Sequence, residues 1–197
     1  MQRILFMAFL LLSLMVCLTS SAWAGGLDDA KAGLAALNGR NYDEAIRLYN
    51  IAIESGELSR ENLAIAYYNR GLAWSHKGDA DKAIVDFTKA IAINPMDGLA
   101  YYDRGVSWGK KGDNDKAFAD YTKAIEIKPN HASAYYNRGL IWFDKGNYDK
   151  AIADFTRAIE LNPKHANAYD ARSYCWEAKG DYDKADADYA KADELMK

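Results

Sequence analysis

This 197-residue sequence has little proline, little cysteine and no excess of positive charge. Its 3 prolines and 14 glycines argue against long disordered linkers, which are rich in these residues. The formal net charge of −3 argues against nucleic acid as a partner, because proteins that bind it present a basic surface to the phosphates. The length and the ordinary content of charged residues, 27%, suit one soluble domain or two.

The N-terminal segment differs in composition from the rest of the chain. Arg3 is followed by a nearly unbroken apolar run over 4–18, and the sequence Ala-Trp-Ala stands at 22–24. These features are typical of a secretory signal peptide, so we expect a signal over 1–24, cleavage after Ala24 and export to the periplasm or the medium. An uncleaved anchor is the alternative. The apolar run is shorter than the roughly 20 residues that span a bilayer, so we expect no stable membrane insertion after cleavage.

After such cleavage Cys175 would be the only cysteine, which excludes an internal disulfide. The equivalent positions in the repeats described next hold Ala73, Ser107 and Ile141. Since this position accepts small or apolar groups, we expect a packed and inert thiol; a redox or intermolecular role is the alternative.

The remaining sequence repeats itself with a period of 34 residues. The string YYNRG begins at Tyr67 and again at Tyr135, and YYDRG begins between them at Tyr101. A glycine, an alanine, an aromatic ring and a proline recur at the same spacing. The recurring positions are Gly71, Gly105 and Gly139; Ala83, Ala117, Ala151 and Ala185; Phe87, Tyr121, Phe155 and Tyr189; and Pro95, Pro129 and Pro163. An earlier, degenerate unit carries Tyr49 and is offset by a four-residue insertion at 60–63.

Each unit has the pattern of two helices. Its first half has apolar and aromatic residues at i, i+3 or i+4, and i+7, as in Tyr67, Gly71 and Trp74. A glycine then ends this helix, and an aspartate or asparagine follows as the expected N-cap of the second helix. These caps are Asp79, Asp113, Asn147 and Asp181. The proline at the end of a unit disfavours helix in the residue before it, which terminates the second helix.

A 34-residue period of paired helices resembles the tetratricopeptide repeat. The resemblance covers nearly all of 26–197 and implies an all-α, right-handed α-solenoid of antiparallel helix pairs. We expect a single solenoid over 25–197 with five pairs, at 26–59, 64–97, 98–131, 132–165 and 166–197. One feature departs from the family pattern, and another marks the end of the stack. Tyrosine precedes tryptophan in the first helix, and Asp186 and Asp193 replace apolar residues of earlier units, as expected of a terminal repeat.

Arginine occupies a first-helix position where the family commonly has leucine. An aspartate follows it by sixteen residues in units two to five, whereas unit one has Ala32 and Leu48 at these two positions. Because the two positions change together, we predict an arginine–aspartate pair between the two helices of each unit. The pairs are Arg70–Asp86, Arg104–Asp120, Arg138–Asp154 and Arg172–Asp188. Two alternatives are pairing of each aspartate with the basic residue three positions on, and a row of arginines that binds an acidic ligand.

The resemblance also implies that the first helices line a concave surface. The residues expected there combine aromatic and aliphatic side chains with amide and carboxylate groups, which suits an extended or helical peptide. They are Tyr68, Asn69, Leu72, Tyr102, Asp103, Val106, Tyr136, Asn137, Leu140 and Phe143. The last unit is more polar, with Asp170, Tyr174 and Glu177. The alternative is that the tyrosines only cover the seams between units.

Sequence motifs for catalysis are lacking. We find no phosphate-binding glycine loop and no nucleophile elbow, and the three histidines lack the spacing of metal ligands on one helix. We therefore expect no enzyme activity, no cofactor and no metal. The expected function is that of an adaptor or scaffold in the periplasm or cell envelope, binding a protein or peptide in the concave groove. A self-assembling homo-oligomer is the alternative.

Overall fold

The computed structural model describes residues 25–197, and the predicted signal segment lies outside the described residues. Within this range the chain forms ten α-helices and no strand, which confirms an all-α solenoid. The helices are α2 (Gly26–Asn38), α3 (Tyr42–Glu54), α4 (Arg60–His76), α5 (Ala80–Ile93), α6 (Gly98–Lys110), α7 (Asn114–Ile127), α8 (Ala132–Asp144), α9 (Tyr148–Leu161), α10 (Ala166–Ala178) and α11 (Tyr182–Met196).

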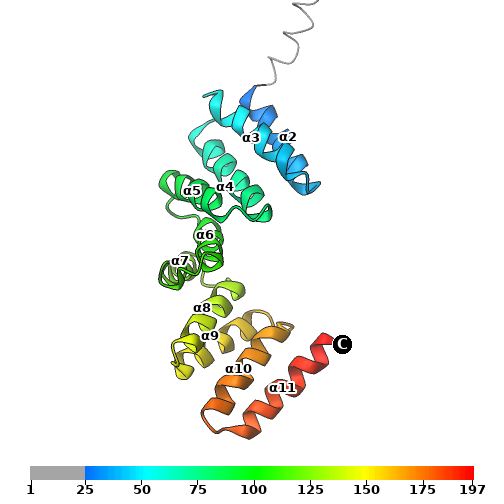
Figure 1. Cartoon of the computed structure of the whole chain (residues 1–197), viewed down its shortest axis with the longest axis vertical. Helices are drawn as coiled ribbons and strands as arrows, with labels where there is room; N and C mark the ends of the chain where they lie inside the picture. Colours follow the sequence, from blue (N-terminus) through cyan, green and yellow to red (C-terminus); the bar gives the residue numbers. More distant parts are fainter. Residues whose placement is uncertain (1–24) are drawn as a thin grey trace, which may run out of the picture.

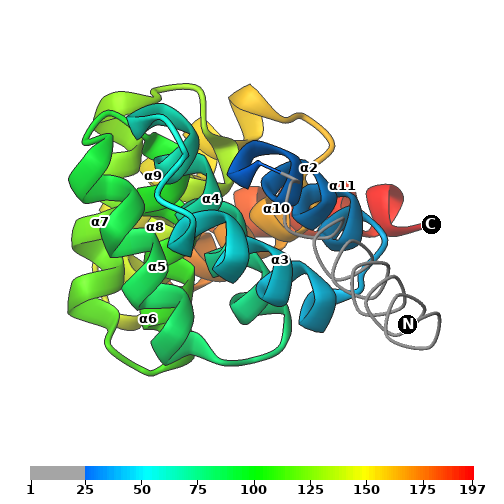
Figure 2. The ribbon, with the colours of Figure 1, turned by 90° about the horizontal axis from the view of Figure 1, so that it is seen from above.

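The helices pack as five consecutive pairs along the long axis of the molecule, from α2–α3 to α10–α11 (Figure 1). First helices of neighbouring pairs also contact each other, as α4 does with α2 and α6. Each second helix instead packs against the first helix of the next pair. Viewed along the long axis, α2–α3 and α10–α11 lie on the side opposite α5 and α7, so the stack turns as it rises (Figure 2).

The insertion at 60–63 lengthens a helix. We expected it to separate units one and two, but α4 begins at Arg60 and has 17 residues. The Ser59 side chain accepts a hydrogen bond from the Asn62 N–H (3.2 Å), so the longer helix has its own N-cap. Four residues add about one turn to a helix. The first helix of unit two therefore extends beyond those of the other units.

The turns inside the pairs share one geometry. In units two to five a glycine with positive φ ends the first helix, and the next residue caps the second helix as predicted. The glycines are Gly78, Gly112, Gly146 and Gly180. In unit one Arg40 takes this conformation with φ 58° and Asn41 is the cap. Two of the first helices differ, because the N-cap residues of α8 and α10, His131 and His165, make no side-chain capping hydrogen bond.

A ring from the second helix fills the space beside the recurring glycine. A Cβ atom on Gly139 would lie 2.7 Å from the ring of Phe155, which is fully buried. Gly71 and Gly105 have the same relation to Phe87 and Tyr121. The last unit breaks the pattern, because Ser173 replaces the glycine and Tyr189 is 60% exposed. Ser173 is buried, and its hydroxyl donates to the Asp170 carbonyl at 2.7 Å.

The last helix exposes acidic residues at positions that are apolar in earlier units, as expected of a terminal repeat. Asp186 and Asp193 are both exposed on α11. Among residues 25–197, no helix is long and apolar enough to cross a membrane.

Candidate binding groove and ion-pair network

The first helices α4, α6, α8 and α10 carry the residues predicted for the groove. All of these residues are half-buried: Tyr68, Asn69, Leu72, Tyr102, Asp103, Val106, Tyr136, Asn137, Leu140 and Phe143. Each side chain is thus partly packed and partly open to solvent. The i, i+4, i+7 spacing places one set on the same face of each helix, and the contacts between α4 and α6 and between α8 and α10 bring successive sets together.

The second tyrosine of each pair packs against the ring on its own second helix. Tyr68 lies 5.7 Å from Phe87 between ring centroids, and Tyr102 lies 5.8 Å from Tyr121. Tyr136 packs on the ring of Phe155 in the same way. Part of each tyrosine ring therefore belongs to the packing of its own unit, and each of the three tyrosines remains half-buried.

The tyrosine hydroxyls bridge to the next unit in two of three cases. The Tyr68 hydroxyl donates to the Asp103 carboxylate at 2.8 Å, and the Asn137 amide donates to the Tyr102 hydroxyl at 3.3 Å. Burial raises the pKa of Tyr68, and burial also raises the pKa of Asp103, although the Tyr68 hydrogen bond opposes the second shift. Tyr68 and Tyr102 thus make the seam contacts named above as the alternative role.

Tyr136 differs because the next unit lacks a polar side chain at the position that bonds to Tyr68 and Tyr102. Residues Asn69, Asp103 and Asn137 share one repeat position, and this position in α10 is Ala171. No hydrogen bond joins the Tyr136 hydroxyl to another residue of the described range. The small alanine leaves a cavity of about 210 Å³ between α8 and α10. Its lining is Tyr136, Leu140, Phe143, Asn167, Asp170, Ala171 and Tyr174.

Two histidines stack on the groove tyrosines from the inter-unit turns. His131 lies 4.4 Å from Tyr102, and His165 lies 4.7 Å from Tyr136 between ring centroids. Burial lowers the pKa of both imidazoles, because it disfavours their charged form. Both are neutral stacking partners at pH 7. No group of three or more potential metal ligands occurs among residues 25–197.

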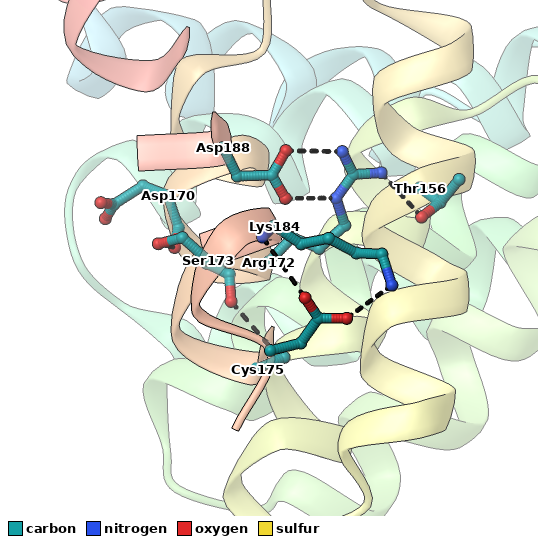
Figure 3. Close-up of polar contacts among 9 residues, drawn as sticks. Thr156, Asp170, Arg172, Ser173, Cys175, Lys184 and Asp188 are labelled. Atoms are coloured by element: carbon teal, nitrogen blue, oxygen red, sulfur yellow. Dashed lines mark hydrogen bonds and ion pairs between the residues drawn. The ribbon is translucent and has the colours of Figure 1, made fainter. Parts of the chain in front are cut away.

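The arginines lie against the aspartates sixteen residues on, in all four units. Nε and Nη2 of Arg172 donate to the two Asp188 oxygens at 2.7 Å each (Figure 3). The other three pairs have the same bidentate geometry at 2.7–2.8 Å. The basic residues three positions after three of these aspartates bond to glutamates instead: Lys123 to Glu126, Arg157 to Glu160 and Lys191 to Glu194.

Each arginine also contacts the preceding unit. The remaining nitrogen, Nη1, donates from Arg172 to Thr156 at 2.8 Å, as Figure 3 shows, and from Arg70 to Asn50 at 2.6 Å. Arg104 and Arg138 reach Thr88 and Thr122 in the same way. The first tyrosine of each pair lies beneath the guanidinium, 5.4–5.7 Å from ring centroid to Cζ. One side chain therefore joins three helices and holds neighbouring units at a fixed spacing.

Comparison with known families agrees with the repeat seen in sequence and structure. A tetratricopeptide repeat model matches residues 64–97 and 132–165, and a TPR repeat model matches 109–143. The chain is a tetratricopeptide repeat protein. No curated protein sequence matches it significantly.

Several solved tetratricopeptide repeat structures share this fold. A crystal structure of MamA is 26% identical, covers 83% of this chain and 94% of its own, and has a TM-score of 0.74. MamA from Desulfovibrio magneticus RS-1 is 23% identical, with coverage of 86% and 96% and a TM-score of 0.74. YrrB, described as a TPR protein with an unusual peptide-binding site, is 21% identical, with 91% of both chains covered and a TM-score of 0.73. At 23% and 21% identity, the similarity to the last two structures shows a shared fold alone.

The tetratricopeptide units are also joined by an exposed ladder that the sequence reading missed. A lysine at the end of each later first helix pairs with an aspartate on the preceding second helix. The pairs are Lys77–Asp43, Lys111–Asp81, Lys145–Asp115 and Lys179–Asp149. The 34-residue spacing of the lysines was the signal that could have revealed it. The sequence reading also missed the cavity between α8 and α10. The signal for it was Ala171, which departs from the polar residue found at this repeat position in the earlier units.

Cys175 lies in the core of the last units. Its side chain is fully buried against the cluster that contains Ala151 and Phe155. Burial raises the pKa of the Cys175 thiol to about 11, which keeps it protonated at pH 7. A packed, unreactive thiol is the role that this environment favours.

Proposed function

We propose that this tetratricopeptide repeat protein is a non-catalytic scaffold that binds a protein or peptide through its concave groove. The observation that carries the proposal is the cavity between α8 and α10, whose rings and aliphatic side chains are not covered by the chain. Tyrosine and phenylalanine offer large contact areas at low cost in side-chain entropy. The half-buried residues of α4 and α6 continue this surface along the stack.

The ion-pair network supports recognition by a preformed surface. Four arginines form bidentate pairs within their own units and donate one further hydrogen bond each to the preceding unit, so the spacing of the first helices is set before a partner arrives. A preorganised groove binds with a smaller loss of conformational entropy than a flexible one. Because these guanidinium groups are directed at aspartates, we assign them to structure and the groove side chains to binding.

We place the scaffold in the periplasm or cell envelope, on the basis of the signal-like composition of 1–24. The test is the mass of the protein purified from the cell that makes it. A chain that begins at Gly25 and is released by opening the outer membrane would support export. A full-length chain recovered from the cytoplasm would contradict it.

Site-specific photocrosslinking in intact cells tests the groove. A benzophenone amino acid replaces Phe143 in the cavity or, as a matched control, Val85, which is 53% exposed on a second helix. The groove proposal expects a partner that crosslinks from position 143 and not from position 85. Crosslinks from position 85 alone would place binding outside the groove. Both positions are partly exposed, so an added aromatic ring should be tolerated in each. Circular dichroism checks this, and the helix content of both variants should equal that of the wild type.

One observation favours self-assembly as the second candidate. Tyr182, Tyr189 and Met196 are 60–63% exposed on α11, which is a concentration of large side chains on the last helix. A homo-oligomer formed through α11 would show a mass that rises with concentration in light scattering. Replacing Tyr189 with serine would then restore the monomer. A constant monomeric mass would leave the groove scaffold as the better description.

A further inference from the structure

The chemistry of the groove changes at its last step. In the first three steps a tyrosine occupies one groove position, and the last unit has Asp170 there. The neighbouring position holds a polar side chain in the earlier units and Ala171 in the last. These two changes act together, because the alanine opens the cavity next to Tyr136 and the aspartate brings a carboxylate to its rim.

Asp170 is the only charged residue that lines this cavity. Within residues 25–197 its carboxylate has no ion pair and accepts no hydrogen bond. In Figure 3 it points away from Arg172 and Asp188, which are paired with each other. Asp170 and Tyr136 line the same cavity; burial raises the pKa of Tyr136, and the Asp170 carboxylate adds to this rise. The other lining groups are rings, aliphatic carbons and the Asn167 amide.

We propose that the cavity between α8 and α10 binds a basic side chain, lysine or arginine, of the peptide partner. This inference rests on the proposed groove function and gives the chemistry of its ligand. The charged head would meet the Asp170 carboxylate and the aromatic faces of Tyr136 and Tyr174, because both attract cations. The apolar stem would lie along Leu140 and Phe143, as basic side chains do on apolar surfaces.

Other side chains fit this cavity less well. An apolar side chain would remove water from the Asp170 carboxylate without replacing the lost hydrogen bonds. An acidic side chain would meet a charge of the same sign. The volume of about 210 Å³ lies below the range of about 300–1,000 Å³ typical of small-molecule sites. The cavity thus suits one side chain of a longer ligand.

A library of random 12-residue peptides, displayed on phage, provides the test. Selection is carried out on the wild-type protein and on Asp170→Asn, with Asp186→Asn as a control for the same change of charge on exposed α11. We expect peptides selected on the wild type and on Asp186→Asn to share a lysine or arginine. An enriched peptide should bind Asp170→Asn at least tenfold more weakly. Replacing its basic residue with norleucine should abolish this difference between the proteins.

A second variant separates the failure of this inference from the failure of the groove proposal. Ala171→Asn places in the cavity the residue that stands at the equivalent position in α8, so it should fill the site without disturbing the helix. Peptides that lack basic residues but lose binding to Ala171→Asn would refute the basic-side-chain inference and retain the groove. Peptides that bind wild type and Ala171→Asn equally, and crosslink only outside the groove, would refute both.

Discussion

Removing Arg138 tests what the arginine–aspartate pairs contribute to the stack. In the wild type its Nε and Nη2 each donate to Asp154 at 2.8 Å, and Nη1 donates to Thr122 at 3.4 Å. The Arg138 side chain is 19% exposed and that of Asp154 is 8% exposed. Arg138→Ala therefore leaves a carboxylate that is largely removed from water and has lost both of its bonds to the guanidinium.

The expected loss of stability follows from this burial. Breaking one partner out of a buried pair costs about 3–5 kcal/mol, and the residual exposure here lowers our expectation to about 2–3 kcal/mol. The double variant Arg138→Ala/Asp154→Ala leaves no orphan charge. It loses hydrogen bonds and packing around the guanidinium, so we expect a smaller loss of about 1–2 kcal/mol. The single variant should thus be less stable than the double variant.

Equilibrium unfolding in urea at pH 7 measures these differences. Circular dichroism and tryptophan fluorescence should both be recorded, because repeat arrays can unfold in more than one step. Lys145→Ala is the matched control, since Lys145 and Asp115 form an inter-unit pair that is 47% and 88% exposed. An exposed pair of this kind should contribute less than about 1 kcal/mol. If Arg138→Ala is as stable as the double variant or more stable, the pair does not have the role assigned to it.

Two further predictions concern the packing and its pH dependence. Gly139→Ala would place a Cβ 2.7 Å from the buried Phe155 ring, so we expect a net loss of about 1–2 kcal/mol in urea unfolding despite the better helix propensity of alanine; equal or greater stability would contradict this. Burial lowers the pKa of His131 and His165, so the unfolded chain binds protons more readily as the pH falls below about 6.5, and folding weakens in that window. His131→Phe/His165→Phe keeps the stacked rings and removes this titration. Its melting temperature should therefore fall less than that of the wild type between pH 7 and pH 5; an equal fall would refute the prediction.

Most of the architecture could be predicted because each unit is specified by residues close in sequence. The caps, the terminating glycines, and the first-helix glycine with the second-helix ring that packs against it all act within one helix pair. Their 34-residue recurrence identifies the fold. The linked change of Ala32 and Leu48 also predicted the contact between arginine and aspartate in the other units. The insertion at 60–63 was placed wrongly, because its residues can either separate two units or, with Ser59 as cap, extend α4.

The sequence alone therefore determined the helix pairs, their number within 26–197 and most of the residues that each pair buries, with Tyr189 of the last unit as an exception. Only the tertiary structure decided what happens between pairs: that the Tyr68 hydroxyl reaches Asp103, that Arg138 reaches Thr122, and that Ala171 leaves a cavity next to Tyr136. The physical reason is that contacts within a pair follow from helical periodicity, whereas contacts between pairs depend on the rotation of one unit against the next. That rotation results from the packing of whole helix faces, and no single motif encodes it.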